Sequence, residues 1–202
     1  HVQSLLALVS NSLVEQVPTE TENNWPKARG YDPVDAISAI TTHALDYIDW
    51  NARERPGKPF FIYFPTIPMH EPLLPSPAFR GMSGIGLYGD FAMQLDAQVG
   101  KVVARLQEHD MLEDTLIIFT SDNGSHGRAG NATLELFPYG SVRTMYGHNM
   151  NGDWRGLKGS MYEGGHRVPF IASWPGHIKS GSVCDQLITL DDLMATIAAI
   201  IG

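Results

Sequence analysis

The sequence has little cysteine and little positive charge. Cys184 is the only cysteine among 202 residues, which excludes an internal disulfide and a cysteine-based zinc site. The chain carries 14 lysines and arginines against 22 aspartates and glutamates, for a formal net charge of −8. Because nucleic-acid binding depends on clustered Lys and Arg, we expect no nucleic-acid partner. An anionic ligand would need positive charge that is concentrated locally or supplied by a metal.

Long apolar runs are missing too, and no stretch approaches the ~20 residues of a membrane-spanning helix. Residues 1–9 are largely apolar, but they contain no Met and no basic segment, so they do not read as a signal peptide. The composition is that of a globular protein, with 43% hydrophobic and 18% charged residues. Plentiful glycine and proline predict long structured loops.

Helical and strand-like patterns alternate along the chain. Helices are predicted to begin at Asp32, where Asp is the N-cap and Pro33 the first helical residue, at Asp90, and at Asp191 or Asp192. Apolar runs predict strands buried on both faces at 59–64 and 115–120, and a further strand at 168–174. This alternation predicts an α/β fold with a mostly parallel central sheet flanked by helices.

In parallel sheets, ligands bind beyond the carboxyl ends of the strands. His70 and Asp122 each follow a predicted strand, and a long glycine-rich loop from residue 122 to about residue 165 contains Lys158. We therefore expect His70, Asp122 and Lys158 to converge at one edge of the sheet.

Three segments contain residues suited to chemistry. The first is Ser121-Asp122-Asn123-Gly124, whose carboxylate and amide oxygens suit Ca²⁺ or Mg²⁺, although the tetrapeptide by itself favours an Asx turn. In the second, Lys158 can bind an anion as a point charge, although by composition the segment is a turn-rich loop with solvated bases. In the third, His70 can donate to an anion or act as a general acid, although a lone loop histidine is more often a surface residue.

Four segments taken together resemble the sulfatase family, the arylsulfatase-like branch of the alkaline-phosphatase superfamily. They are KPFFIYFPTIPMHEP (58–72), GDFAMQLDAQVGKVVARLQEHDMLEDTLIIFTSDNG (89–124), NGDWRGLKGSMYEGGHRVPFIASWPGHI (151–178) and, more weakly, LITLDDLMATIAAIIG (187–202). The resemblance implies that residues 58–202 are the central and C-terminal part of a sulfatase catalytic domain. Residues 1–57 are then an N-terminal loop and helix segment of the same core.

The resemblance also implies a role for each candidate residue. Asp122 and Asn123 fall where the family binds its divalent cation, Ca²⁺ before Mg²⁺, and Lys158 falls on the lysine that contacts the sulfate group. His70 falls on the histidine that contacts the sulfate or the leaving oxygen, and His148 sits where some members place a substrate-facing residue. Two further motif residues, Glu163 and Arg167, are expected to pair and to hold the loop.

The family's nucleophile has no counterpart in these 202 residues. It is a formylglycine made from Cys or Ser in a C/S-x-P-x-R motif. Cys184 is followed by Asp185-Gln186-Leu187, and the segment Ser173-Trp174-Pro175-Gly176-His177 has His where Arg is needed. We interpret the chain as a fragment of a sulfatase that hydrolyses sulfate monoesters, itself inactive and with its cation absent or weakly held. A phosphonate or phosphate monoester hydrolase of the same superfamily, or a non-catalytic sulfatase-like binding module, remains the alternative.

The resemblance implies a sulfated small molecule or carbohydrate as substrate. It also implies a periplasmic, secreted or lysosomal location, which the chain itself does not fix. Because a divided parallel sheet leaves unpaired edges and uncovered apolar side chains, we expect the chain by itself to self-associate.

Overall fold

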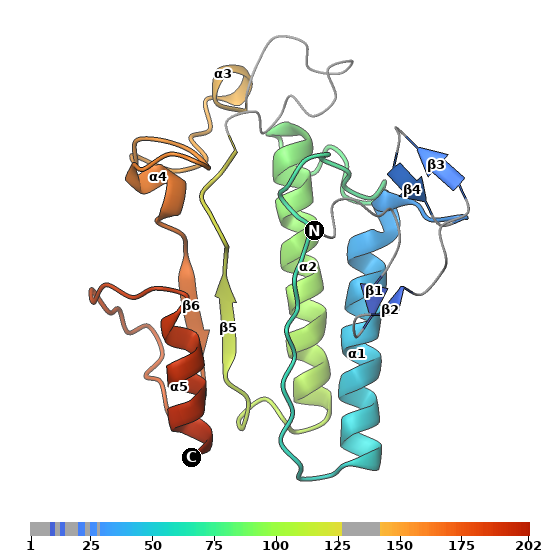
Figure 1. Cartoon of the computed structure of the whole chain (residues 1–202), viewed down its shortest axis with the longest axis vertical. Helices are drawn as coiled ribbons and strands as arrows, with labels where there is room; N and C mark the ends of the chain where they lie inside the picture. The colour runs from blue at the N-terminus through green and yellow to red at the C-terminus, as the bar shows by residue number, and fades with distance from the viewer. Residues whose placement is uncertain (1–8, 11–12, 15–19, 23–24, 28, 127–141) are drawn as a thin grey trace. The chain divides into compact units, whose positions relative to one another are not determined.

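The computed structural model describes residues 9–10, 13–14, 20–22, 25–27, 29–126 and 142–202 (Figure 1). The chain divides into two compact units. The first, unit 1, comprises His1–His109 with Arg128–Met150, and the second, unit 2, comprises Asp110–Gly127 with Asn151–Gly202. Each unit has its own elements and is described separately.

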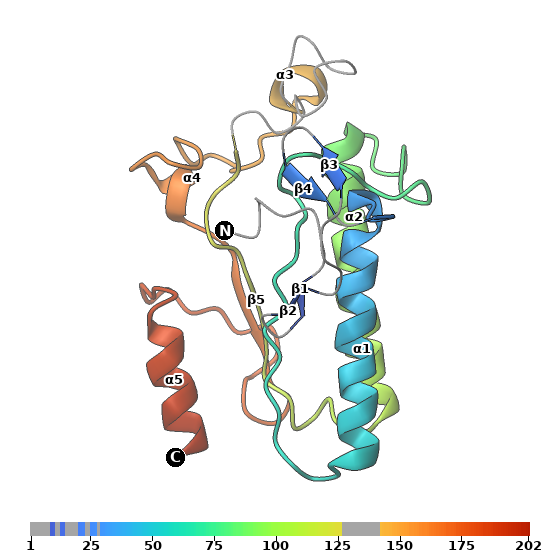
Figure 2. The same cartoon turned by 45° about the vertical axis from the view of Figure 1, so that its right-hand side comes forward.

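Unit 1 is built on two long helices, α1 (Ala36–Glu54) and α2 (Gly86–Glu108), which lie side by side and run in the same direction in both views (Figures 1 and 2). A short 3-10 helix, η2 (Pro33–Asp35), leads into α1. The Asp32 carboxylate accepts a hydrogen bond from Val34 N–H at 2.9 Å, which confirms the predicted helix start. The apolar core of the unit comprises Ala36, Ile37, Ala44, Ile48, Leu73, Tyr88, Phe91, Leu95, Leu106 and Val142.

Short elements complete unit 1. They are two antiparallel hairpins, β1 (Val9–Ser10) with β2 (Leu13–Val14) and β3 (Glu20–Glu22) with β4 (Trp25–Lys27), and the helix α3 (Val142–Tyr146).

Helix α2 begins at Gly86, four residues before the predicted cap. Asp90 is inside the helix and only 1% exposed. Its carboxylate accepts hydrogen bonds from Gly81 N–H at 2.8 Å, Ser83 N–H at 2.9 Å and the Ser83 hydroxyl at 2.7 Å. The prediction that Asp90 caps α2 is therefore wrong, because this carboxylate instead satisfies the donors of the loop that precedes the helix.

A charged cluster links α1 and α2 near their C-terminal ends. The Asp49 carboxylate pairs with the Arg105 guanidinium and lies 2.7 Å from His109 Nε2, while Arg105 Nε also donates to Glu108 at 2.9 Å. These hydrogen bonds, first from His109 and then from Arg105, lower the pKa of Asp49 below its ordinary value. Cations at a helix C-terminus also interact favourably with the helix dipole, so Arg105 suits the last turn of α2.

The segment predicted as a buried strand at 59–64 belongs to no assigned strand. The Phe60 ring meets Tyr47 of α1 edge-on at 6.2 Å, but Phe61 and Tyr63 are 69% and 79% exposed. The expectation of burial on both faces is therefore wrong. An apolar segment is buried on both faces only where neighbouring strands pair with it and other layers cover both sides. Among the described residues, no strand pairs with residues 59–64.

Unit 2 contains one two-stranded sheet and two helices. Strand β5 (Ile117–Thr120) pairs antiparallel with β6 (Phe170–Ser173), so that Ile117 lies opposite Ser173 and Thr120 opposite Phe170. The helices are α4 (Glu163–His166) and α5 (Asp192–Ile201), and α5 begins where the sequence predicted. Both strands fall within predicted runs, although β5 is half-buried and β6 mostly exposed.

The strand pairings do not confirm the predicted parallel sheet. Every strand pairing among the described residues is antiparallel, so the mostly parallel central sheet is not found there. Parallel neighbours need a crossover, which is usually a helix of a dozen or more residues. Between β5 and β6 the described helices are only the short α3 and α4, and the chain returns in the opposite direction.

The surface of α5 is apolar and exposed. Met194 and Ile201 are 81% and 77% exposed, and the helix has no buried residue. Such surfaces mark association sites, which supports self-association, still a prediction. None of the helices in the described part of the chain is both long and apolar enough to cross a membrane.

Replacing Asp90 with Asn should lower the free energy of unfolding by about 1–3 kcal/mol, because the Gly81 and Ser83 donors lose a buried, charge-assisted acceptor. Asp96→Asn, on an exposed face of the same helix, is the matched control and should change little. Burial alone would raise the pKa of Asp90, but the hydrogen bonds from Ser83 and Gly81 outweigh it and lower the pKa.

The pH dependence of this loss follows from the sign of the shift. Because the folded pKa is lowered, the charged Asp90 stabilises the fold above the unfolded pKa of about 3.9 and loses that effect as pH falls. The difference in free energy of unfolding between wild type and Asp90→Asn, measured by urea denaturation, should therefore become smaller below about pH 4. A difference that is constant or widens in acid would contradict this account.

Candidate functional site

The two candidate metal ligands lie just beyond the carboxyl end of β5. The Ser121 hydroxyl donates to Asn123 O at 3.0 Å, and Asn123 Nδ2 donates to Gly124 O at 3.0 Å. Asp122 is exposed and Asn123 half-buried. Asp122 and Asn123 thus form a bend that presents oxygens at the strand end, although not the Asx turn that the composition favours, because Gly124 N–H donates to Gly165 O.

Lys158 belongs to a second loop of the same unit. Its backbone N–H donates to Ser125 O at 2.9 Å, and Gly124 N–H donates to Gly165 O at 3.0 Å. The structure therefore brings the segment that follows Asp122 and Asn123 together with the loop that carries Lys158. This pairing needs no strand, since it is made by individual backbone groups.

Glycines allow the two loops to approach each other closely. A Cβ atom at Gly124 would lie 1.9 Å from Gly164 O, and one at Gly164 would lie 2.3 Å from Gly156 O. A Cβ atom at Gly165 would lie 2.3 Å from Ser160 O. Real Cβ atoms do not come this near to a carbonyl oxygen, so the two loops touch backbone to backbone. We call Gly124, Gly156, Gly164 and Gly165 the glycine contact.

Two arginines stack on aromatic rings of the Lys158 loop. Arg167 donates to Glu163 at 3.1 Å, which confirms the expected pairing, and its guanidinium also lies 4.0 Å from the Trp154 ring centroid. Arg155 lies 3.8 Å from the centroid of the Tyr162 ring. The sequence reasoning missed the two stacks, although arginine and aromatic residues so close along one loop are a usable signal.

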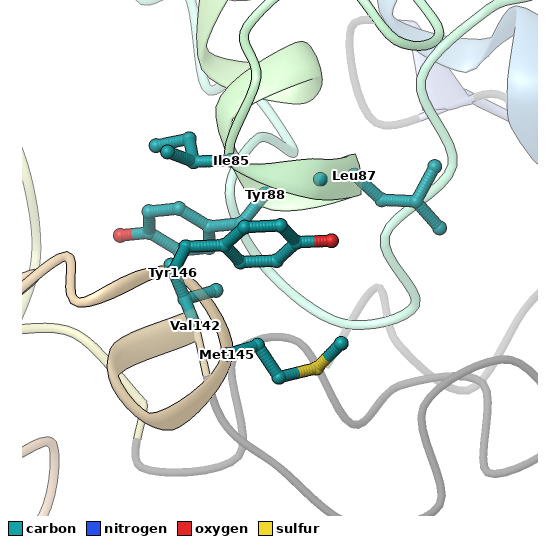
Figure 3. A pocket seen from close by; sticks show the side chains of 7 residues that line it. Ile85, Leu87, Tyr88, Val142, Met145 and Tyr146 are labelled. Atoms are coloured by element: carbon teal, nitrogen blue, oxygen red, sulfur yellow. The ribbon is translucent and has the colours of Figure 1, made fainter.

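His70 and His148 belong to unit 1. His70 is exposed, and its Nδ1 lies 2.7 Å from Glu71 O. The His148 ring centroid lies 6.4 Å from that of Tyr88. Tyr88 also lines a small pocket between the start of α2 and α3 (Figure 3). The cavity is about 10 Å³, room for about one water and not for a sugar. Convergence of His70 with Asp122 and Lys158 involves both units and stays a prediction.

The donor chemistry of Asp122 and Asn123 fits a hard divalent cation, since a carboxylate and an amide oxygen are typical Ca²⁺ ligands. Two residues are only part of the usual coordination of about 6–8 oxygens. Within the described ranges, no group of three or more His, Cys, Asp or Glu residues is placed to hold a metal.

The structure places the two segments that the sequence analysis compared with the nucleophile motif. Ser173 is the last residue of β6, and the chain then turns, with His177 N–H and Ile178 N–H both donating to Trp174 O, at 3.1 and 2.9 Å. The Trp174 and His177 rings stack at 4.0 Å. This segment is a structural turn, and Cys184 is an exposed free thiol.

Comparisons with known proteins agree with one another. A model of the family described as Sulfatase matches residues 11–202, which extends the region covered by the motifs toward the N-terminus. An N-acetylgalactosamine-6-O-sulfatase from Bacteroides thetaiotaomicron is 32% identical over 95% of this chain. Arylsulfatase A from Homo sapiens is 38% identical over 74% of it. The crystal structure of the PsFucS1 sulfatase from Pseudoalteromonas sp. superposes over 84% of this chain with a TM-score of 0.67 and 32% identity.

The matched part is a minority of each of these proteins. The chain covers 35% of the Bacteroides protein, 26% of the human one and 30% of the Pseudoalteromonas structure.

Replacing Gly124 with Ala should separate the two loops, because the added Cβ meets a backbone oxygen that cannot rotate away. Overpacking of this kind costs about 1–3 kcal/mol of folding stability. Gly100→Ala is the matched control, since its Cβ would meet nothing within 4 Å. At this exposed helical position alanine should stabilise by up to about 1 kcal/mol. Urea unfolding of both variants in the whole protein checks the contrast, and equal effects would refute the close contact.

Proposed function

The chain belongs to the sulfatase family, and we propose that the whole protein hydrolyses sulfate monoesters at a site that includes Asp122, Asn123, Lys158 and His70. The observation that carries the proposal is the 2.9 Å hydrogen bond from Lys158 N–H to Ser125 O. It ties the backbone of a cationic residue to the turn that presents two hard oxygen ligands. A sulfate ester needs such a combination, because its oxygens are anionic and gain charge as the bond breaks.

Each residue has a distinct part in the proposed reaction. Asp122 and Asn123 would hold a divalent cation, Ca²⁺ before Mg²⁺, which when bound supplies charge that polarises the sulfuryl oxygens. Lys158 would contact a sulfate oxygen and stabilise charge that develops there. His70 would donate a hydrogen bond or a proton to the leaving oxygen, and His148 would face the substrate.

A sulfated carbohydrate is the proposed substrate class. The Bacteroides relative that aligns with 95% of this chain is named for a sulfated amino sugar, and a human relative, 35% identical over 79% of the chain, carries the name N-acetylgalactosamine-6-sulfatase. We infer that the whole protein acts on a sulfated sugar, with an amino-sugar sulfate as the first compound to test. A location outside the cytoplasm is proposed from the family resemblance.

In the whole protein, Lys158→Ala and Asp122→Ala should each lower kcat by about 10²–10³-fold, the usual effect of removing one electrostatic stabiliser from a site. The loss at Asp122 should be partly recovered by raising the Ca²⁺ concentration, whereas the loss at Lys158 should not. Turnover of a chromogenic aryl sulfate across a Ca²⁺ series measures both effects.

Exposed residues of the same unit provide the controls. Lys179→Ala and Asp185→Ala remove the same types of charge and should leave kcat unchanged. Wild-type turnover in the Lys158→Ala variant would contradict the proposed site. A wild type that cleaves phosphate or phosphonate esters faster than sulfate esters would favour the alternative hydrolase, and no turnover of any of these esters would favour a binding module.

Expressed alone, these 202 residues should not turn over an aryl sulfate, because they contain no C/S-x-P-x-R segment to supply the nucleophile. The measurement is the same chromogenic assay with the whole protein as the positive control. Turnover above background that Lys158→Ala abolishes would show that another residue of this chain acts as nucleophile.

A further inference from the structure

Asn151 connects the two loops of the candidate site through both ends of its side-chain amide. Its Oδ1 accepts a hydrogen bond from Ser125 N–H at 3.1 Å, and its Nδ2 donates to Gly156 O at 3.0 Å. Asn151 lies 26 residues from Ser125 in sequence and is half-buried. One side chain therefore bridges the turn of the metal ligands and the loop of Lys158.

Ser125 is held on both sides of its peptide backbone. Its N–H donates to Asn151, and its carbonyl accepts from Lys158 N–H. Gly156, the other partner of Asn151, is two residues before Lys158 and also lies in the glycine contact. The bonds from Asn151 to Ser125 and Gly156, and from Lys158 to Ser125, close a ring of contacts around the short stretch that leads to Lys158.

A primary amide suits this bridge because it carries an acceptor and a donor at fixed separation. A Ser or Thr hydroxyl is shorter and offers a single oxygen for both bonds, and a carboxylate would place an oxygen against the Gly156 carbonyl. The arginine stacks, by contrast, contact the loop through exposed side chains, and exposed interactions of this kind constrain a backbone weakly.

We propose that Asn151 is a positioning residue that fixes Lys158 relative to Asp122 and Asn123, and that it raises the rate of sulfate ester hydrolysis through Lys158. The inference rests on the proposed function of that site. Asn151 itself touches neither substrate nor cation in this account. Its effect is geometric. If the Lys158 ammonium group is displaced by about 1 Å from the charge that develops in the reaction, the rate can fall by about 10²-fold.

The test is a double-mutant cycle in the whole protein between Asn151→Ala and Lys158→Ala. Asn151→Ala alone should lower kcat and kcat/KM alike, by about 10- to 100-fold, as expected when an interaction made only in the transition state is weakened. In the Lys158→Ala background, it should change kcat by no more than about twofold, because its effect requires the lysine. Asn151→Gln, which keeps both groups on a longer side chain, should fall between wild type and Asn151→Ala.

Ser182→Ala is the matched control. It removes an exposed side-chain hydrogen bond to Lys179 O, 2.7 Å long, from another turn of unit 2, and kcat should not change. Hydrogen exchange gives a readout that does not need turnover: Asn151→Ala should speed exchange of the Ser125 amide, and Ser182→Ala should not.

The outcomes separate the two proposals. Suppose that wild type is active and Lys158→Ala is impaired. The positioning role is then wrong, and the proposed function stands, if Asn151→Ala keeps wild-type kcat. The same holds if Asn151→Ala lowers kcat by as large a factor in the Lys158→Ala background as in wild type. If the loss of kcat in Asn151→Ala is fully explained by the fraction of the protein that thermal melts show to be unfolded, the positioning role is also wrong. If wild type cleaves no sulfate ester, the proposed function fails, and the positioning role fails with it.

Discussion

The candidate site depends on a place where two backbone segments touch without side chains between them. Gly124 and Gly164 are so close that a Cβ atom on Gly124 would lie 1.9 Å from the Gly164 carbonyl oxygen. Glycine allows this approach because it has no Cβ, and the hydrogen bond from Gly124 N–H to Gly165 O makes use of it. The same contact sets how near Lys158 can come to the turn of Asp122, so the chemistry of the site depends on a steric condition at glycines.

The proposed anion site lies in an acidic chain, so its charge needs an explanation. With a net charge of −8 on these residues, the chain offers no long-range attraction for a sulfate ester, and the proposed site would rely on local cations. Arg155 and Arg167 carry two of the nearby positive charges, but each lies over an aromatic ring, and Arg167 also pairs with Glu163. Both arginine charges are thus engaged within the loop, while a lysine, a compact charge on a flexible stem, suits the contact with an anion.

The sequence predicted the features that depend on local chemistry. The start of the first helix was predicted correctly because Asp32 and Pro33 specify a cap within three residues. Asp90 shows the limit of this reasoning, since a capping residue and a buried acceptor for a preceding loop look the same in sequence. The burial of residues 59–64 and the direction of β6 depend on what lies beside them, which an apolar run does not encode. The order of motifs indicated Asp122 and Lys158, but not that Asn151 bridges their loops.

Three aspartates show what distinguishes a structural carboxylate from a candidate ligand. Asp90 is buried, and its two oxygens accept three hydrogen bonds from its own preceding loop, so little capacity is left for a cation. Asp49 pairs with Arg105 and lies within hydrogen-bond distance of His109. For Asp122, no hydrogen bond or ion pair is found among the residues that the structure describes, and its side chain is exposed directly after a strand. The Asp122 oxygens therefore have no partner within the described residues, and they are exposed at a strand end whose next residues are held by Asn151 and Lys158. This exposure is the physical argument for the proposal that Asp122 binds a cation, and it is independent of the place of Asp122 in a motif.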